Sequence, residues 1–126
     1  MKVLICGDRH WKTRVEIEDR ILQLLAHSSA LGQPLSIIEG MASGADRIAG
    51  DIAIIYGIAL ATYEPDWDKF GTKAGPIRNR EMLDEKPDLV VAFHNDIGKS
   101  KGTWDTIKEA NRRGIKVEII SSKEAK

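Results

Sequence analysis

The fold of this chain is decided by the stretch Leu35-Ser36-Ile37-Ile38-Glu39-Gly40-Met41-Ala42-Ser43-Gly44-Ala45-Asp46-Arg47-Ile48-Ala49. A short apolar run ends at Glu39, a turn of small residues follows, and apolar residues then recur at helical spacing. A strand, a glycine-containing loop and a helix in this order can hold a phosphate, because small residues allow close approach and the helix presents N–H groups to the anion. Ser43 and Asp46 have the spacing of a capping box, which would fix the start of the helix. A glycine that only lets the strand turn tightly is the alternative interpretation.

Apolar runs elsewhere in the chain repeat this pattern of strand and helix. Runs of strand character cover residues 2–6, 36–39, 58–63, 89–93 and 115–120, with helical patterns between them. Residues 69–75 are predicted to be irregular, and Pro76 to open the next helix. The alternation predicts an α/β fold: a Rossmann-like three-layer sandwich with a central parallel sheet of about five strands in the order 3-2-1-4-5. Residues 1–120 form one domain, and residues 121–126 are expected to be a solvated C-terminal tail.

The composition excludes several classes of protein. The chain has 126 residues, of which 19 are basic and 19 acidic, whereas a protein that binds duplex nucleic acid by electrostatics alone is normally more basic. The single cysteine, Cys6, excludes an internal disulfide and fits a reducing compartment. No apolar run approaches the ~20 residues of a membrane span, and the N-terminus has no signal-peptide pattern. We therefore expect a cytoplasmic protein with no membrane partner, and we expect it to form a homo-oligomer.

Ligands of such a sheet bind beyond the carboxyl ends of the strands, at the switch point between the first and fourth strands. The loops that meet there cover residues 7–11, 40–44 and 94–103. Within them Thr103 is expected to be the N-cap of the last helix, and His94 to be structural or solvated, because it has no partner at metal-ligand spacing. No metal site is predicted. The candidate ligand-binding residues at this edge are Gly7, Asp8, Arg9, Trp11, Glu39, Gly40, Ala42, Ser43, Gly44, Asp46, Ser100, Lys101, Gly102 and Thr103.

Basic residues cluster where the fourth helix is predicted to begin. Lys73, Arg78 and Arg80 lie near this N-terminus, although the helix dipole disfavours an exposed cation there by ~0.3–1 kcal/mol. We interpret Arg78 as a phosphate ligand; the alternative is a salt bridge, to Glu39, Asp46 or Asp66. Trp11 and Trp67 follow predicted strands on the ligand side, where an indole stacks on a nucleobase for ~1–3 kcal/mol. For Trp67 the alternative is a lid over the core.

Together these residues resemble the SLOG superfamily, which includes the DprA/SMF proteins and the LOG nucleotide hydrolases, and within it the small stand-alone YspA-like (YpsA-related) branch. The matching pieces run along the whole chain in the order of the family. They are Gly7-Asp8-Arg9, Gly40-Met41-Ala42-Ser43-Gly44-Ala45-Asp46, Asp66-Trp67 with Gly71, Ala74-Gly75-Pro76-Ile77-Arg78-Asn79, and Ser100-Lys101-Gly102-Thr103. The resemblance implies one SLOG-like Rossmannoid domain over residues 1–120 and a nucleotide-derived ligand that contains ribose and phosphate, with Arg78 and Asn79 in its site.

Two positions depart from the pattern of the family. Glu39-Gly40 stands where the family usually has two glycines. The LOG hydrolases carry a catalytic glutamate three residues after a Gly-Thr pair, and the position three beyond Thr103 is Thr106. Asp105 comes one residue early and would point about 100° away around a helix. The pattern therefore does not predict LOG-type cleavage of a nucleoside monophosphate.

Three functions remain open at this stage. The leading one is a sensor or carrier of a nucleotide derivative without strong catalysis, in which Glu39 orients a ribose. The second is a hydrolase of an N-glycosidic or phosphoester bond, whose acid or base would be Glu39, Asp46 or Asp8. The third is DprA-like binding of single-stranded nucleic acid, in which Trp11 or Trp67 stacks on bases. Its phosphate contacts would be Arg9, Lys69, Lys73, Arg78, Lys99 and Lys101.

Overall fold

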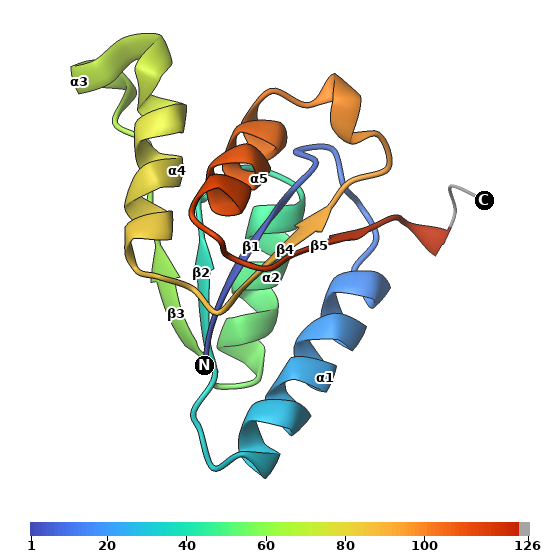
Figure 1. Ribbon diagram of the computed structural model, residues 1–126. Coiled ribbons are helices and arrows are strands. Elements are labelled where there is room, and N and C mark those ends of the chain that lie inside the picture. The colour runs from blue at the N-terminus through green and yellow to red at the C-terminus, as the bar shows by residue number, and fades with distance from the viewer. Residues whose placement is uncertain (124–126) are drawn as a thin grey trace.

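Strand β1 (Lys2–Gly7) forms the centre of a five-stranded parallel sheet in the computed structural model, which describes residues 1–123 (Figure 1). Val3 on this strand pairs with Ile37 on one side and with Leu89 on the other. The strand order β3-β2-β1-β4-β5 confirms the predicted topology. The other strands are β2 (Ser36–Glu39) and β4 (Leu89–Phe93), which flank β1, and β3 (Ala59–Thr62) and β5 (Val117–Ile120) at the edges.

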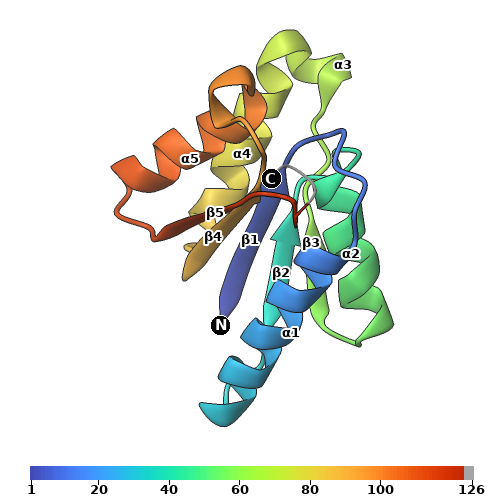
Figure 2. The ribbon, with the colours of Figure 1, turned by 90° about the vertical axis from the view of Figure 1, so that its right-hand side faces the viewer.

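Helices cover both faces of the sheet, which confirms the predicted α/β sandwich (Figure 2). Helices α1 (Val15–Ala30) and α2 (Ala45–Ile55) lie on one face, and α4 (Ala74–Asp84) and α5 (Gly102–Arg112) on the other. Successive side chains of a strand point to opposite faces. Val3 and Ile5 therefore join the core beneath α1 and α2, whereas Leu4 and Cys6 join the core beneath α4 and α5.

The segment between β3 and α4 is helical, so the prediction of an irregular stretch over residues 69–75 is wrong. It contains the short helix α3 (Trp67–Phe70) and the 3₁₀ turn η1 (Gly71–Lys73). The Asp66 carboxylate caps α3 by accepting the backbone N–H of Lys69 (3.1 Å). Helix α4 then begins at Ala74, two residues earlier than predicted, because Pro76 is tolerated anywhere in a first turn, where N–H groups have no partner within the helix.

The start of α2 differs from the predicted capping box. Gly44 is the N-cap, and its φ of 77° lies in the left-handed region that favours glycine. A Cβ atom at Gly44 would lie 2.3 Å from the backbone oxygen of Asp8, so the residue is also required by the close packing of two loops. Ser43 Oγ donates to the Arg9 carbonyl (3.2 Å) instead of capping the helix.

The end of the described chain is attached to the domain. Ser122 is buried, and its N–H donates to Asn95 Oδ1 (2.7 Å), while the Lys123 N–H donates to Glu16 Oε2 (2.8 Å). The expected solvated tail is therefore wrong for Ser122, whereas Ser121 and Lys123 are exposed, and residues 124–126 lie outside the described residues. Among residues 1–123, no helix combines the length and the apolar character needed to cross a membrane.

Candidate functional site

A crevice of about 450 Å³ opens beyond the carboxyl ends of β1 and β4. It lies at the switch point of the sheet, where the chain leaves β1 toward one edge and β4 toward the other. The residues that line it come from both strand ends and the loops after them, from α2 and α4, and from α5 and the segment before it. They are Cys6, Gly7, Asp8, Arg9, His10, Ala42, Asp46, Arg78, Asn79, Met82, His94, Lys99, Ser100, Lys101, Gly102, Thr103 and Thr106.

The charged side chains of the crevice are mostly cationic. Four of them, Arg9, Arg78, Lys99 and Lys101, face two carboxylates. Lys99 also pairs with the exposed Asp96 (Nζ to Oδ2, 3.6 Å), a contact that solvent weakens because both side chains are more than half exposed. A concave site lined mainly by one sign of charge raises the local concentration of the opposite ion. The crevice is therefore suited to an anionic ligand.

Asp46 is the buried carboxylate of the crevice. Its side chain returns to the preceding loop, where Oδ2 accepts the N–H groups of Gly40 (3.2 Å) and Ala42 (3.3 Å). The residue is only 5% exposed. Burial raises the pKa of Asp46 from 3.8 to about 6, against the lowering effects of the Ala42 N–H, the Arg78 charge and the Gly40 N–H. Two amides that the sequence predicted for phosphate are thus occupied by a carboxylate of the protein itself.

Glu39 lies beneath the loop and does not line the crevice, which corrects the prediction that it orients a ribose there. It is 3% exposed, and its Oε2 accepts the N–H of Met41 (2.9 Å). Burial raises the pKa of Glu39 to about 7, and the charge of Asp46 adds to this effect. The side chain lies over Gly50 of α2, where a Cβ atom would approach its carboxyl carbon to 3.7 Å. Of the three carboxylates predicted as acid or base, Asp8 and Asp46 reach the crevice.

Arg78 reaches the crevice from the second turn of α4. Its guanidinium donates through Nη1 to the Gly40 carbonyl and through Nε to Asn79 Oδ1 (2.9 Å). Among residues 1–123 its nitrogens form no ion pair within 4.0 Å, so the alternative of a salt bridge to Glu39, Asp46 or Asp66 is not what the structure shows. Gly40 allows this close approach: a Cβ atom there would lie 2.6 Å from Nη1, so the Arg78 side chain would have to move.

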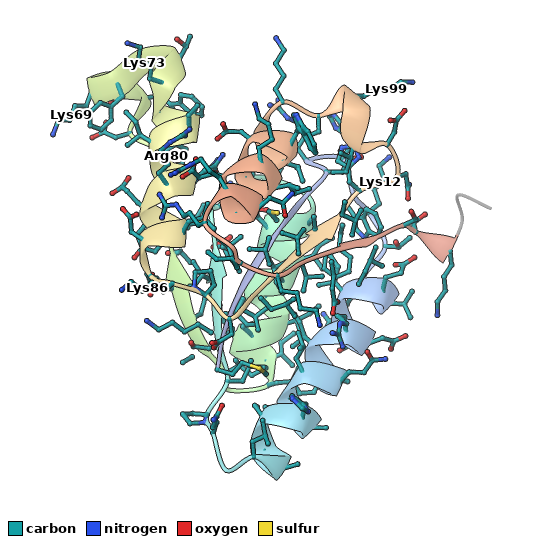
Figure 3. All side chains as sticks on the ribbon, in the orientation of Figure 1. Lys12, Lys69, Lys73, Arg80, Lys86 and Lys99 are labelled. Carbon is teal, nitrogen blue, oxygen red and sulfur yellow. The ribbon has the colours of Figure 1, made fainter. Side chains whose placement is uncertain are left out.

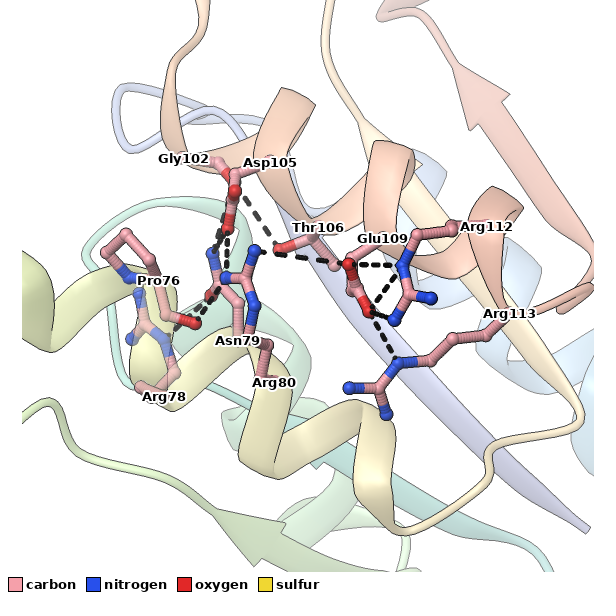
Figure 4. A network of polar contacts seen from close by, with 10 residues as sticks. All are labelled: Pro76, Arg78, Asn79, Arg80, Gly102, Asp105, Thr106, Glu109, Arg112 and Arg113. Carbon is pink, nitrogen blue, oxygen red and sulfur yellow. Dashed lines mark hydrogen bonds and ion pairs between the residues drawn. The ribbon is translucent and has the colours of Figure 1, made fainter.

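Asn79 connects Arg78 to the first turn of α5. It is buried, and its Nδ2 donates to Asp105 Oδ2 (3.1 Å) and to the Gly102 carbonyl (3.4 Å), as Figure 4 shows. Asp105 also pairs with Arg80 (3.5 Å) and does not line the crevice. The predicted direction of Asp105, away from the ligand side, agrees with this contact between α4 and α5.

The N-terminus of α5 forms another wall of the crevice. Ser100 Oγ accepts the N–H of Thr103 (3.1 Å), so Ser100 rather than Thr103 supplies the side-chain cap; Thr103 is buried inside the first turn. Thr106 lines the crevice one turn later, and its hydroxyl donates to the Gly102 carbonyl (3.4 Å). A threonine hydroxyl thus occupies the position where the LOG pattern has a glutamate.

Both tryptophans predicted to stack on a ligand lie elsewhere. Trp11 is 5% exposed, packs edge-on against Phe93 (ring centroids 5.7 Å apart) and donates its indole N–H to the Thr13 carbonyl (2.7 Å). Trp11 is a core residue, and it has no free face for a base. Trp67 is 57% exposed on α3, outside the crevice, so it is neither a lid over the core nor part of this site.

Three predicted ligand residues of the loop between β2 and α2 support the loops behind the crevice without lining it. They are Gly40, Ser43 and Gly44.

Several lining residues were missed from the sequence. His94 follows β4 directly, and this position at the carboxyl edge was the signal that could have found it; its Nδ1 accepts the Asp96 N–H (2.9 Å). His10 belongs to the loop after β1. Cys6, Met82 and Thr106 form the floor, and burial raises the pKa of the Cys6 thiol well above its usual range. Among residues 1–123, no three His, Cys, Asp or Glu side chains are placed to hold a metal ion.

The chain belongs to a SLOG family. The family described as YAcAr (YspA, cpYpsA-related SLOG family) matches residues 1–70. The chain is also 36% identical over 121 residues to the Gene 61 protein of Mycobacterium phage D29, which covers 92% of this chain and 93% of the phage protein. These matches confirm the resemblance on the motifs.

The fold is similar to that of DNA processing protein A (DprA) from Streptococcus pneumoniae. The TM-score is 0.70 at 19% identity over 96% of this chain. This chain spans about half of that DprA chain, 50% by coverage. The likeness therefore concerns the shared sheet and its helices.

Proposed function

We propose that this protein is a sensor or carrier that binds a nucleotide-derived anion, containing ribose and phosphate, in the crevice between β1 and β4. The observation that carries the proposal is the convergence of Arg9, Arg78 and Lys101 on one concave site from three segments distant in sequence. SLOG domains in general bind nucleotide-derived ligands, and membership of the family supports the same class here.

The phosphate is expected at the start of α5. This helix has 11 residues, so its dipole favours an anion at Gly102, and Lys101 immediately precedes it. The loop 40–44 cannot offer the N–H groups of Gly40 and Ala42, because Asp46 already accepts both. The proposal therefore assigns phosphate binding to Lys101, Gly102 and Arg78 rather than to the glycine loop.

A hydrolase of the same ligand class is the second candidate, and Asp46 is the observation that favours it. Its pKa of about 6 allows the carboxyl to exchange a proton near neutral pH, which a general acid or base requires. Glycoside cleavage needs two such groups, however; Asp8, the second carboxylate of the crevice, is only half-buried, and Thr106 stands where the LOG hydrolases have their catalytic glutamate. We place binding first for this reason.

Isothermal titration calorimetry with AMP and ADP-ribose tests the proposal. Arg78→Ala is expected to weaken binding by ~1.5–3 kcal/mol, the range for a hydrogen bond to a charged group. Arg80→Ala is the matched control, because Arg80 is an exposed arginine of the same helix that pairs with Asp105 outside the crevice. Lys101→Ala, on an exposed position, repeats the test without touching the Gly40 contact.

Two results would contradict the binding proposal. One is the absence of heat from both nucleotides at millimolar concentration with folded wild-type protein. The other is unchanged affinity in both Arg78→Ala and Lys101→Ala. Product appearing at ordinary enzyme rates during the titration would favour the hydrolase instead.

A further inference from the structure

We propose that Asp46 makes the crevice selective for ligands whose sugar carries a free 2-hydroxyl, so that ribose phosphates bind in preference to their 2-deoxy counterparts. The inference deepens the proposed function and rests on it. It assigns a specificity-determining role to the Asp46 carboxylate, of which one oxygen accepts two loop N–H groups and the other is available to a ligand.

The two carboxylate oxygens of Asp46 have different surroundings. Oδ2 is held by the N–H groups of Gly40 and Ala42, whereas Oδ1 accepts no hydrogen bond from residues 1–123. Within the same residues, every fully buried side-chain oxygen has a hydrogen-bond partner, so Oδ1, which has none, is not fully buried. Because Asp46 lines the crevice, its Oδ1 keeps access to that space. An acceptor is thus presented to the ligand in a fixed direction.

The charges around Asp46 decide what this acceptor binds. Arg78 approaches from α4, Glu39 from β2 and the Cys6 thiol from β1, and Arg78 is the cation of this group. A phosphate placed against Oδ1 would be repelled by the carboxylate. A cationic ligand would be repelled by the four basic side chains of the crevice. A neutral donor, such as the hydroxyl of a sugar next to the phosphate, satisfies both conditions.

The other carboxylates are less suited to this role than Asp46. Asp8 also lines the crevice, but it is only half-buried, and one N–H, that of His10 (2.9 Å), holds its side chain within its own turn. Glu39 lies beneath the loop, outside the crevice. Asp46 is therefore the buried acceptor that a ligand hydroxyl can reach.

The substitution Asp46→Asn keeps one oxygen of the side chain and replaces the other by an NH₂ group. The loop N–H groups need an acceptor, so the amide oxygen takes the place of Oδ2 and the NH₂ group takes the place of Oδ1. The crevice then presents a donor, and the charge-assisted bond from a sugar hydroxyl is lost. Asp51→Asn is the matched control, because Asp51 is an exposed carboxylate of the same helix.

Calorimetric titrations with ribose 5-phosphate, 2-deoxyribose 5-phosphate and inorganic phosphate test the inference, and AMP with 2′-deoxy-AMP repeats it with a base present. Wild-type protein and Asp51→Asn are expected to prefer the ribose form at least tenfold, about 1.4 kcal/mol. Asp46→Asn is expected to reduce this preference to less than threefold while binding inorganic phosphate at least as well as the wild type.

Each outcome decides the matter. Equal binding of ribose and deoxyribose phosphates by the wild type would overturn the inference and leave the proposed function standing, and this comparison requires no variant to fold. A tenfold preference that persists in Asp46→Asn would move the selectivity to another residue. If none of the phosphates binds, the proposed function fails and the inference fails with it.

Discussion

Replacing Asp46 by asparagine is expected to stabilise the protein at neutral and alkaline pH. The carboxyl is 5% exposed, and its pKa rises from 3.8 to about 6 on folding. At about 1.4 kcal/mol per pKa unit, ionisation of Asp46 lowers the free energy of unfolding by about 3 kcal/mol. Asparagine keeps an acceptor for Gly40 and Ala42 without carrying the charge, so Asp46→Asn should gain up to about 3 kcal/mol at pH 8.

The sign of this effect follows from which state holds the proton. Between pH 4 and 6 the folded protein binds a proton at Asp46 that the unfolded chain has released, so wild-type stability falls as pH rises through this window. Glu39, with a pKa of about 7, extends the decline to pH 7. Above pH 7 both carboxyls are ionised in the folded protein, and the loss of wild-type stability is complete. Below pH 4 both states are protonated, and the difference between the variant and the wild type should vanish.

Urea denaturation at several pH values between 3.5 and 8 measures the difference. The free energy of unfolding of Asp46→Asn should exceed that of the wild type at pH 8 by about 3 kcal/mol and converge with it near pH 4. Asp51→Asn, on the exposed side of the same helix, should follow the wild type throughout. A variant that is less stable than the wild type at pH 8, or a difference that does not change with pH, would refute the reasoning.

Three other predictions concern the glycines of the loops, Trp67 and the binding of single-stranded nucleic acid. Gly44→Val should destabilise the fold by at least about 2 kcal/mol in urea, because its Cβ meets the Asp8 oxygen at 2.3 Å, whereas Gly32→Ala, at a similar φ with open space around it, should lose about 1 kcal/mol or less. Trp67→Ala should leave nucleotide affinity unchanged in calorimetry, since Trp67 lies outside the crevice; a tenfold loss would place it in the site. Single-stranded oligonucleotides should bind weakly at physiological salt in fluorescence anisotropy. Submicromolar affinity, with log K falling against log salt concentration at a slope of about −0.7 per phosphate contact, would favour the DprA-like function.

The distribution of basic side chains is the reason for the last of these expectations. Lys69 and Lys73 lie on the projecting α3–η1 segment, whereas Lys99 lies at the other side of the molecule, beyond α5 (Figure 3). The α4–α5 contact, with Asp105 and Glu109, stands between them. A single strand that touched both groups would have to cross this contact, where Asp105 and Glu109 already pair with Arg80, Arg112 and Arg113.

The sheet could be predicted from the sequence because its signals are local. Residues 89–93 and 36–39 are apolar runs that match β4 and β2 in full, and the right-handed crossover rule then leaves few strand orders. The segment around Pro76 could not be placed, because a proline is compatible with any position of a first turn and the cap at Asp66 lies ten residues earlier. The sequence thus predicted α4 with a late start and missed the short helices α3 and η1 before it.

The site could be predicted only as a set of converging loops. Arg78, Lys101 and Asp46 line the crevice as expected from their places near helix starts. Glu39 and Trp11 lie outside the crevice, because the Glu39 carboxylate accepts the Met41 N–H beneath the loop and Trp11 packs against Phe93. Such contacts depend on how the loops pack and cannot be read from the local sequence. Asp46 accepts the N–H groups of Gly40 and Ala42, six and four residues earlier, and this depends on how the loop folds back over the start of α2.

Amide chemical-shift mapping of the ¹⁵N-labelled protein with AMP tests the central claim most directly. We predict saturable shifts at Asp8 to His10, at Arg78 and Asn79, and at Lys99 to Thr103, the segments that converge on the crevice. The amides of Asp66 to Asp68, beside the exposed Trp67, should not move. Saturable shifts at that second segment with an unchanged crevice, or no shifts at millimolar AMP, would contradict the account.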